Sequence, residues 1–254
     1  MSRMSLVIAT LIFITPFISP LRADTRVITL WNYYLTPPFL VGDSEGLAID
    51  FVNLLNDELA GKFEFRLISL PRARLNKYLA EQRQGVVLFV NWRWMGDDAE
   101  NHYLWTPAIW QDRNEVISSS QTRLVFHGPE SLKGLTLVAV RGRQYQSLKP
   151  MLARNEIKRF DVNREKQALA LLLKGRGDLT IQPRSVAMFL LDDMKLKQQV
   201  YLSPKPFLSF TRHMMLTSDL HELHPTLSDF VSRLDKNLRW KKILKKYDLV
   251  EGSE

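Results

Sequence analysis

The stretch from Gly85 to Trp110 constrains the fold more than any other. It opens with an apolar run at 86–90 and changes abruptly at Asn91-Trp92-Arg93-Trp94. A short apolar run predicts a strand of a parallel sheet that is buried on both faces. Ligands of open α/β sheets bind beyond the carboxyl ends of such strands. We therefore expect a ligand pocket at this point. The alternative is that the two tryptophans cap the core and Arg93 lies in solvent.

The first 23 residues form a separate segment. Arg3 supplies positive charge, residues 6–18 are almost wholly apolar, and the small Ala23 precedes Asp24. This is the pattern of a secretory signal peptide, and the apolar run is short for a membrane span. We expect export to the periplasm and cleavage before Asp24. Leu21 is bulkier than the residue preferred at the cleavage site, so an uncleaved anchor is the alternative.

Composition narrows the classes of function. The chain has no cysteine, which excludes disulfides and thiolate chemistry. Without Arg3 and Arg22, the mature chain has 33 Lys and Arg against 27 Asp and Glu, a net charge of +6. A basic protein favours anionic ligands or membrane headgroups. Much of this charge lies at 236–246, where we expect the solvated face of a terminal helix. No nucleic-acid-reading motif accompanies it, so we expect no nucleic acid partner.

Strand and helix signals alternate twice along the chain. In the first half, strands are predicted at 27–34, 63–68 and 86–90, with helices from Gly46 to Gly61 and at 71–84. In the second half, strands are predicted at 135–140, 158–162 and 178–181, with helices after Gln144, at 165–174 and from Pro183 to about Asp193. This order implies βαβ units and parallel sheets.

The closing segments return to the first half. Residues 200–216 are predicted to cross back from the second half of the fold to the first. One final helix is then predicted, with a buried apolar stripe made of Leu223, Leu227, Phe230, Val231, Leu234 and Leu238. We expect an α/β two-lobed clamshell, with a mostly parallel sheet flanked by helices in each lobe. Two hinge crossings are expected near 116–120 and 206–210. Lobe 1 would comprise 24–117 and 206–254, and lobe 2 would comprise 118–205.

The order of motifs resembles one family, the periplasmic solute-binding proteins of amino-acid-type ABC transporters, which have the type II periplasmic-binding-protein fold. The motifs are Pro37 to Phe39, Gly46 to Phe51, Leu104 to Pro107, Ser131 to Gly134, Gly175 to Asp178 and Trp240 to Tyr247. The resemblance covers essentially the whole mature chain. It implies a monomer that binds a small solute between two lobes and delivers it to a membrane permease.

The departures from the family pattern concern the ligand. Members that bind amino acids usually have an arginine near the position of Ala99, whereas Arg93 lies six residues earlier. They usually have a carboxylate where this chain has the uncharged Gln182, and small hydroxyl residues where it has Arg143 and Gln144. A free zwitterion would lose both charge partners, and an unpaired buried charge is unfavourable. We therefore expect a small anionic or aromatic ligand, with an amino-acid-like solute as the alternative.

The predicted cleft combines arginines with aromatic rings. Arginine forks suit carboxylate or phosphate, and aromatic faces suit flat or cationic groups. The turn at Gly142 would add backbone N–H donors for an anion. For each arginine, the alternative is an ordinary surface charge. The expected ligand-binding residues are Tyr33, Trp92, Arg93, Trp94, Trp110, Arg141, Arg143 and Gln182.

Signals for catalysis are weaker. The chain lacks a nucleophile elbow, a P-loop and a dinucleotide fingerprint. His221 and His224 have helical spacing, but Pro225 disturbs it, so we expect no metal site and no cofactor. Asp97, Asp98 and Glu100 are expected to form a solvated acidic loop. A ligand-sensing module for a membrane signalling partner is the main alternative function, and a dehydratase-like enzyme on the same fold is a lesser one.

Overall fold

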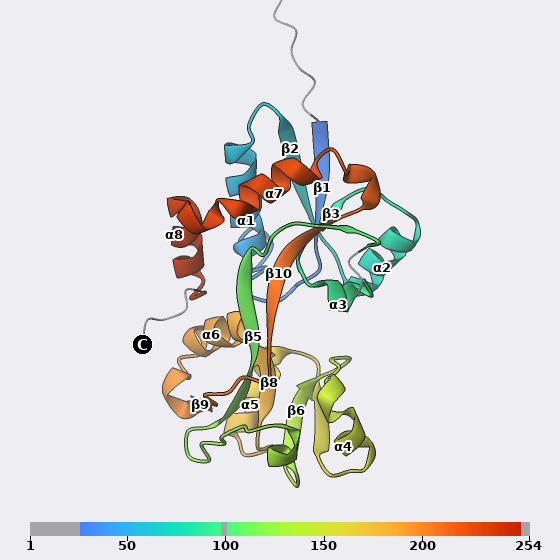
Figure 1. Cartoon of the computed structure of the whole chain (residues 1–254). Coiled ribbons are helices and arrows are strands. Elements are labelled where there is room, and N and C mark those ends of the chain that lie inside the picture. The colour runs from blue at the N-terminus through green and yellow to red at the C-terminus, as the bar shows by residue number, and fades with distance from the viewer. Residues whose placement is uncertain (1–25, 98–100, 250–254) are drawn as a thin grey trace, which may run out of the picture.

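The computed structural model describes residues 26–97 and 101–249, which form two lobes joined by two long strands (Figure 1). The predicted signal peptide and the residues Asp98 and Glu100 lie outside the described residues. Within the described part, no helix is long and apolar enough to cross a membrane.

The first lobe is built as the sequence predicts. Its parallel strands β1 (Arg26–Asn32), β2 (Phe63–Ser69) and β3 (Val86–Val90) have the order β2-β1-β3, and every residue of β3 is buried. The connections carry the helices α1 (Leu47–Glu58) and α2 (Arg72–Ala80). The apolar face of α1 is fully buried, because its apolar residues recur at helical spacing. Helix α2 ends before the predicted limit at residue 84.

Two strands cross between the lobes. β5 (Trp110–Ser119) and β10 (Leu208–Leu216) pair antiparallel over the register from Arg212 opposite Trp110 to Leu208 opposite Asn114. β10 also pairs antiparallel with β3 and with the short β4 (Leu104–Trp105). The result is one eight-stranded sheet whose main order is β2-β1-β3-β10-β5-β8, so both lobes share a continuous backbone scaffold.

The second lobe contains a parallel pair, β6 (Thr136–Val140) and β7 (Lys158–Val162). Leu179, directly before β8 (Thr180–Pro183), forms an isolated parallel bridge with Leu137 of β6. Its helices are α4 (Lys149–Ala153), α5 (Glu165–Leu173) and α6 (Arg184–Asp193), and β9 (Val200–Leu202) pairs with β5. The helix predicted after Gln144 is only a 3₁₀ turn, Gln146–Leu148, followed by the short α4.

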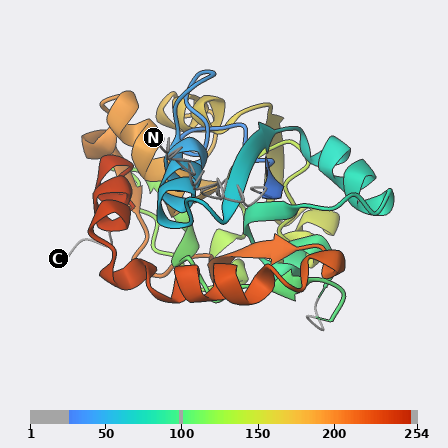
Figure 2. The ribbon, with the colours of Figure 1, turned by 90° about the horizontal axis from the view of Figure 1, so that it is seen from above.

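The prediction of one closing helix is wrong. The segment forms α7 (His224–Ser232), a 3₁₀ turn and α8 (Leu238–Lys246), which lie along one side of lobe 1 (Figure 2). Asn237 starts a new helix, because its side-chain oxygen accepts hydrogen bonds from the N–H groups of Arg239 (2.9 Å) and Trp240 (3.0 Å). Trp240 therefore turns inward, whereas Leu238, assigned to the buried stripe, is 72% exposed.

Candidate functional site

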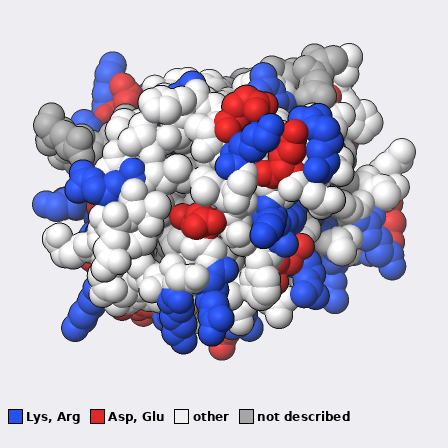
Figure 3. Space-filling view, turned by 90° about the horizontal axis from the view of Figure 1, so that it is seen from below, with Lys and Arg blue, Asp and Glu red and all other residues white. Residues whose placement is uncertain are grey.

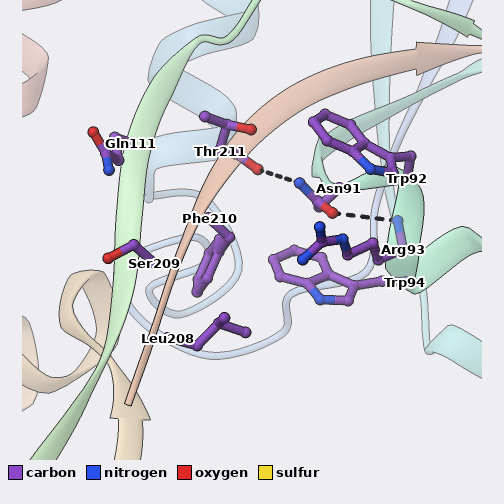
Figure 4. A pocket seen from close by; sticks show the side chains of 9 residues that line it. All are labelled: Asn91, Trp92, Arg93, Trp94, Gln111, Leu208, Ser209, Phe210 and Thr211. Carbon is purple, nitrogen blue, oxygen red and sulfur yellow. Dashed lines mark hydrogen bonds between the residues drawn. The ribbon is translucent and has the colours of Figure 1, made fainter. Parts of the chain in front are cut away.

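The segment after β3 is fixed to a crossing strand. Asn91 caps the one-turn helix α3 (Trp92–Met95) by accepting a hydrogen bond from the N–H of Arg93 at 3.2 Å. Its Nδ2 donates to the carbonyl of Thr211 in β10 at 3.1 Å (Figure 4). Gly96 ends the helix with φ 71°, a backbone conformation that glycine adopts without strain. This part of the chain is therefore held against the hinge.

A cavity of about 260 Å³ lies between α3 and the crossing strands. We call it the Arg93 cavity. Trp94 and Phe210 meet edge to face in its wall, with ring centroids 4.8 Å apart, and Figure 4 shows Arg93 and Trp94 extending from α3 toward β10. It is lined by Asn91, Trp92, Arg93, Trp94, Gln111, Leu208, Ser209, Phe210 and Thr211.

The Arg93 cavity combines a free cationic group with aromatic surface. Arg93 is exposed, and within the described part of the chain its guanidinium makes no ion pair or hydrogen bond. None of the described residues that line the cavity is Asp or Glu. The arrangement can bind an anionic group through the guanidinium and a flat apolar group against the rings.

Two of the first-lobe residues predicted for the site lie elsewhere. Tyr33 is half-buried and stacks on Tyr34, with 4.2 Å between the ring centroids and 2.8 Å between the two hydroxyl oxygens. Burial, reinforced by the adjacent Tyr34, raises the pKa of Tyr33, so it remains neutral. Trp110 packs on Phe39 and Phe89 and lines a separate small pocket with Arg184.

The second-lobe residues do not gather at the Arg93 cavity in this arrangement. Arg141 lines a separate, open depression of about 300 Å³. Arg143 forms an ion pair with Glu165 at 3.1 Å. Gln182 is fully buried and donates to the carbonyl of Glu165, whereas its Oε1 has no partner among the described residues.

The acidic loop is not solvated as expected, at least at its first residue. Asp97 is only 3% exposed, and its carboxylate accepts hydrogen bonds from Trp105 Nε1 at 2.7 Å and from the backbone N–H groups of residues 101, 102 and 103. Burial opposes ionisation, but these hydrogen bonds outweigh it, so the pKa of Asp97 is lowered. In the described part of the chain, no cluster of three or more potential metal ligands occurs.

Sequence reasoning missed Arg212, the most buried charged side chain near the cavity. It is 1% exposed and forms an ion pair with Asp112 at 2.8 Å. Burial by itself lowers the pKa of Arg212, but Tyr34 and Asp112 outweigh it, so the net shift is upward and the guanidinium stays charged. The sequence contains a signal for this burial, because Arg212 lies between Phe210 and Met214 at two-residue spacing, so all three side chains share one face of a strand.

Similar proteins are found by structure but not by sequence. No protein-family model matches the chain, and no curated protein matches it. An ancestral arginine-binding protein bound to arginine is similar at 14% identity, with 87% of this chain and 97% of that chain covered and a TM-score of 0.66. The GluR0 ligand-binding core from Nostoc punctiforme in complex with L-glutamate is 13% identical, with 88% and 99% covered and a TM-score of 0.66.

A third similar structure is the B. pertussis BvgS periplasmic domain, at 18% identity and a TM-score of 0.69, with 88% of this chain but 43% of that chain covered. At such identities the likeness concerns the fold. The resemblance seen in the sequence is thus confirmed at that level, together with the two lobes and their crossing strands. This chain has the two-lobed α/β fold of type II periplasmic binding proteins, shared with amino-acid-binding members of that fold.

Proposed function

We propose that the protein is an exported binding protein that captures a small anionic or aromatic solute at the Arg93 cavity and delivers it to a membrane transporter. The observation that carries this proposal is the exposed Arg93 guanidinium beside aromatic rings, in a cavity whose described lining includes no carboxylate. The similar structures bound to arginine and to L-glutamate support a small solute as the ligand class.

The charges of the cavity favour an anion over a zwitterion. Arg93 can pair with a carboxylate or phosphate through its planar fork. An α-ammonium group would meet no acidic partner among the described lining residues, and a desolvated unpaired charge is unfavourable. Trp94 and Phe210 supply surface for a flat apolar body. A carboxylate or phosphate attached to an aromatic or apolar group fits this chemistry.

Closure of the lobes would complete the site. A solute that contacts both lobes stabilises the closed arrangement by population shift. Arg141, Arg143 and Gln182 are the second-lobe groups that we propose would approach it. In the first lobe, Tyr33 and Trp110 belong to the aromatic packing near the crossing strands. No catalytic step is part of this proposal.

A ligand-sensing module for a membrane signalling partner is the second candidate. The similarity to the BvgS periplasmic domain favours it, because that domain matches 88% of this chain at a TM-score of 0.69. The same cavity would serve both roles. Affinity capture of membrane proteins with the mature chain distinguishes them: a permease supports transport, whereas a sensor protein supports signalling.

The test of the binding site is a thermal-shift screen of the chain from Asp24 against aromatic and aliphatic carboxylates, phosphates, amines and amino acids. A ligand at about 100 times its Kd should add roughly 2.7 kcal/mol to the free energy of unfolding. Replacing Arg93→Ala should abolish the shift caused by anions, because the cationic fork is lost. Arg93→Lys should retain part of it, since the charge remains but the fork does not.

The matched control is Arg74→Ala on α2, which removes an exposed arginine of the same lobe that has no ion pair among the residues that the structure describes. It should leave the anion-induced shift unchanged. If Arg93→Ala and Arg74→Ala bind the same anion equally well, the assignment of the cavity is wrong. A response to ordinary amino acids alone would instead show that the anion preference is wrong.

A further inference from the structure

We propose that the hinge contains a guanidinium-binding site and that the chain fills it with its own Arg212. The site shares Trp94 and Phe210 with the Arg93 cavity, but the inference does not depend on a solute bound there. The Arg212 guanidinium lies among aromatic rings whose centroids are 4.9 to 5.6 Å from its Cζ atom. Cation–π attraction at such distances is strongest when the cation is desolvated, as here at 1% exposure. The rings belong to Tyr34, Phe39, Trp94, Trp110 and Phe210.

Hydrogen-bond acceptors also face the N–H groups at the edge of the guanidinium. Its Nε and Nη2 both approach Asp112 Oδ2, at 2.9 and 2.8 Å, and its Nη1 donates to the carbonyl of Phe89 at 3.0 Å. Rings therefore surround the group while acceptors meet its N–H bonds. A planar cation with several fixed donors satisfies both sets of contacts. An ammonium group is a compact point charge without a planar fork, so it does not match both the rings and the acceptors.

The backbone at Phe89 supports a built site. Phe89 has φ 61°, which is rare for a bulky residue. The pairing register between β3 and β10 also shifts here, between His213 and Met215. Irregular pairing of this kind is common next to functional sites, where it redirects groups out of the ladder. At Phe89 the backbone carbonyl accepts a hydrogen bond from Arg212.

Groups from both lobes meet at this site. Asp112 accepts hydrogen bonds from Ser185 Oγ at 2.7 Å and from the backbone N–H of Ser185 at 3.3 Å, and Ser185 lies in the first turn of α6 in the second lobe. Phe89 belongs to β3 in the first lobe. The occupant of the site thus connects both crossing strands with both lobes. An internal guanidinium would hold this arrangement of the lobes without an external solute.

Chemical rescue tests the inference. Arg212→Ala removes the atoms of N-ethylguanidinium and leaves Asp112 without its cationic partner. We expect a lower melting temperature, which 20 mM N-ethylguanidinium should raise by about 3 °C or more if it binds well below that concentration. Ethylammonium at the same concentration should give no comparable rise. The wild-type protein should show no rise with either probe, because its site is occupied.

A second variant and a second measurement keep the test decisive. Adding Asp112→Asn to Arg212→Ala should remove the rescue, because the carboxylate that recognises the probe is lost. If Arg212→Ala does not fold by itself, its refolding yield from urea is compared with each probe present. Equal effects of the two cations would overturn the inference, since the site would then be a cavity without guanidinium recognition. No effect of N-ethylguanidinium on melting or refolding would also overturn it.

Discussion

At the scale of single residues, Asp97 shows how one carboxylate can order a loop. Its two oxygens receive three backbone N–H groups and the indole of Trp105. Trp105 lies in β4, which pairs with β10, so Asp97 ties the loop that follows α3 to the sheet. The position of the tryptophans near the Arg93 cavity therefore depends partly on a residue that does not line it.

Asp97→Asn should lower the free energy of unfolding at pH 7 by about 1–3 kcal/mol, because a hydrogen-bonded buried charge is lost. The pKa of Asp97 is lowered in the folded state. Its stabilising contribution is therefore complete above the ordinary carboxyl pKa of about 3.9 and disappears as the pH falls through the lower, folded-state pKa. Urea unfolding of both proteins at pH 7 and at stepwise lower pH measures the difference.

The same substitution at Asp43, which is exposed in a turn, is the control and should change stability little. A difference between wild type and Asp97→Asn that stays constant down to acid pH would contradict the role of the charge.

What the sequence could and could not predict is clearest among these residues. Trp92, Arg93 and Trp94 were placed at the edge of a buried strand, because an apolar run ending in polar residues is a local pattern. Arg212 and Asp112 are 100 positions apart, and nothing local identifies them as partners. Buried pairs of this kind depend on how β5 and β10 are paired, which a single sequence does not specify.

At the scale of elements, the alternation of strands and helices was predictable, but the end of the chain was not. The apolar stripe continues across residues 223–234, and the break comes from a cap at Asn237. Asn237 also donates to Glu58 in α1 at 3.0 Å. The cap thus orients α8 so that Trp240 packs on Phe51 and Trp110, which secures the terminal helix to the core of lobe 1.

Asn237→Ala should lower the free energy of unfolding by about 1 kcal/mol, because two N–H groups of α8 lose their acceptor. For a chain of this size, that corresponds to a decrease of roughly 2–4 °C in melting temperature, measurable by circular dichroism. Asn237→Ser retains a capping oxygen and should recover most of the loss. If serine and alanine are equally destabilising, the contact with Glu58 and not the cap is the important one.

At the scale of the whole molecule, the net charge differs between the two predicted lobes. In the sequence, the predicted second lobe, 118–205, contains sixteen Lys and Arg but seven Asp and Glu, a net charge of +9, whereas the remaining ranges 24–117 and 206–254 together sum to −3. In the face viewed from below, Figure 3 shows basic side chains mainly around the margin, with acidic side chains among them. A basic second lobe raises the local concentration of anions around the protein, which agrees with the anionic ligand proposed for the Arg93 cavity.

The position of one lobe relative to the other gives the last prediction. Ser185→Ala removes the second-lobe hydroxyl that donates to Asp112 but leaves Arg212 and its aromatic rings in place. We expect the protein to stay folded, with about 1.5–3 kcal/mol lower stability from the lost hydrogen bond to a charged group. Its radius of gyration by small-angle X-ray scattering should increase, because the lobes separate more easily. The control is Ser232→Ala, because among the described residues the Ser232 hydroxyl bonds only to the Ser228 carbonyl within α7. An unchanged radius of gyration in Ser185→Ala would mean that the crossing strands alone hold the lobes.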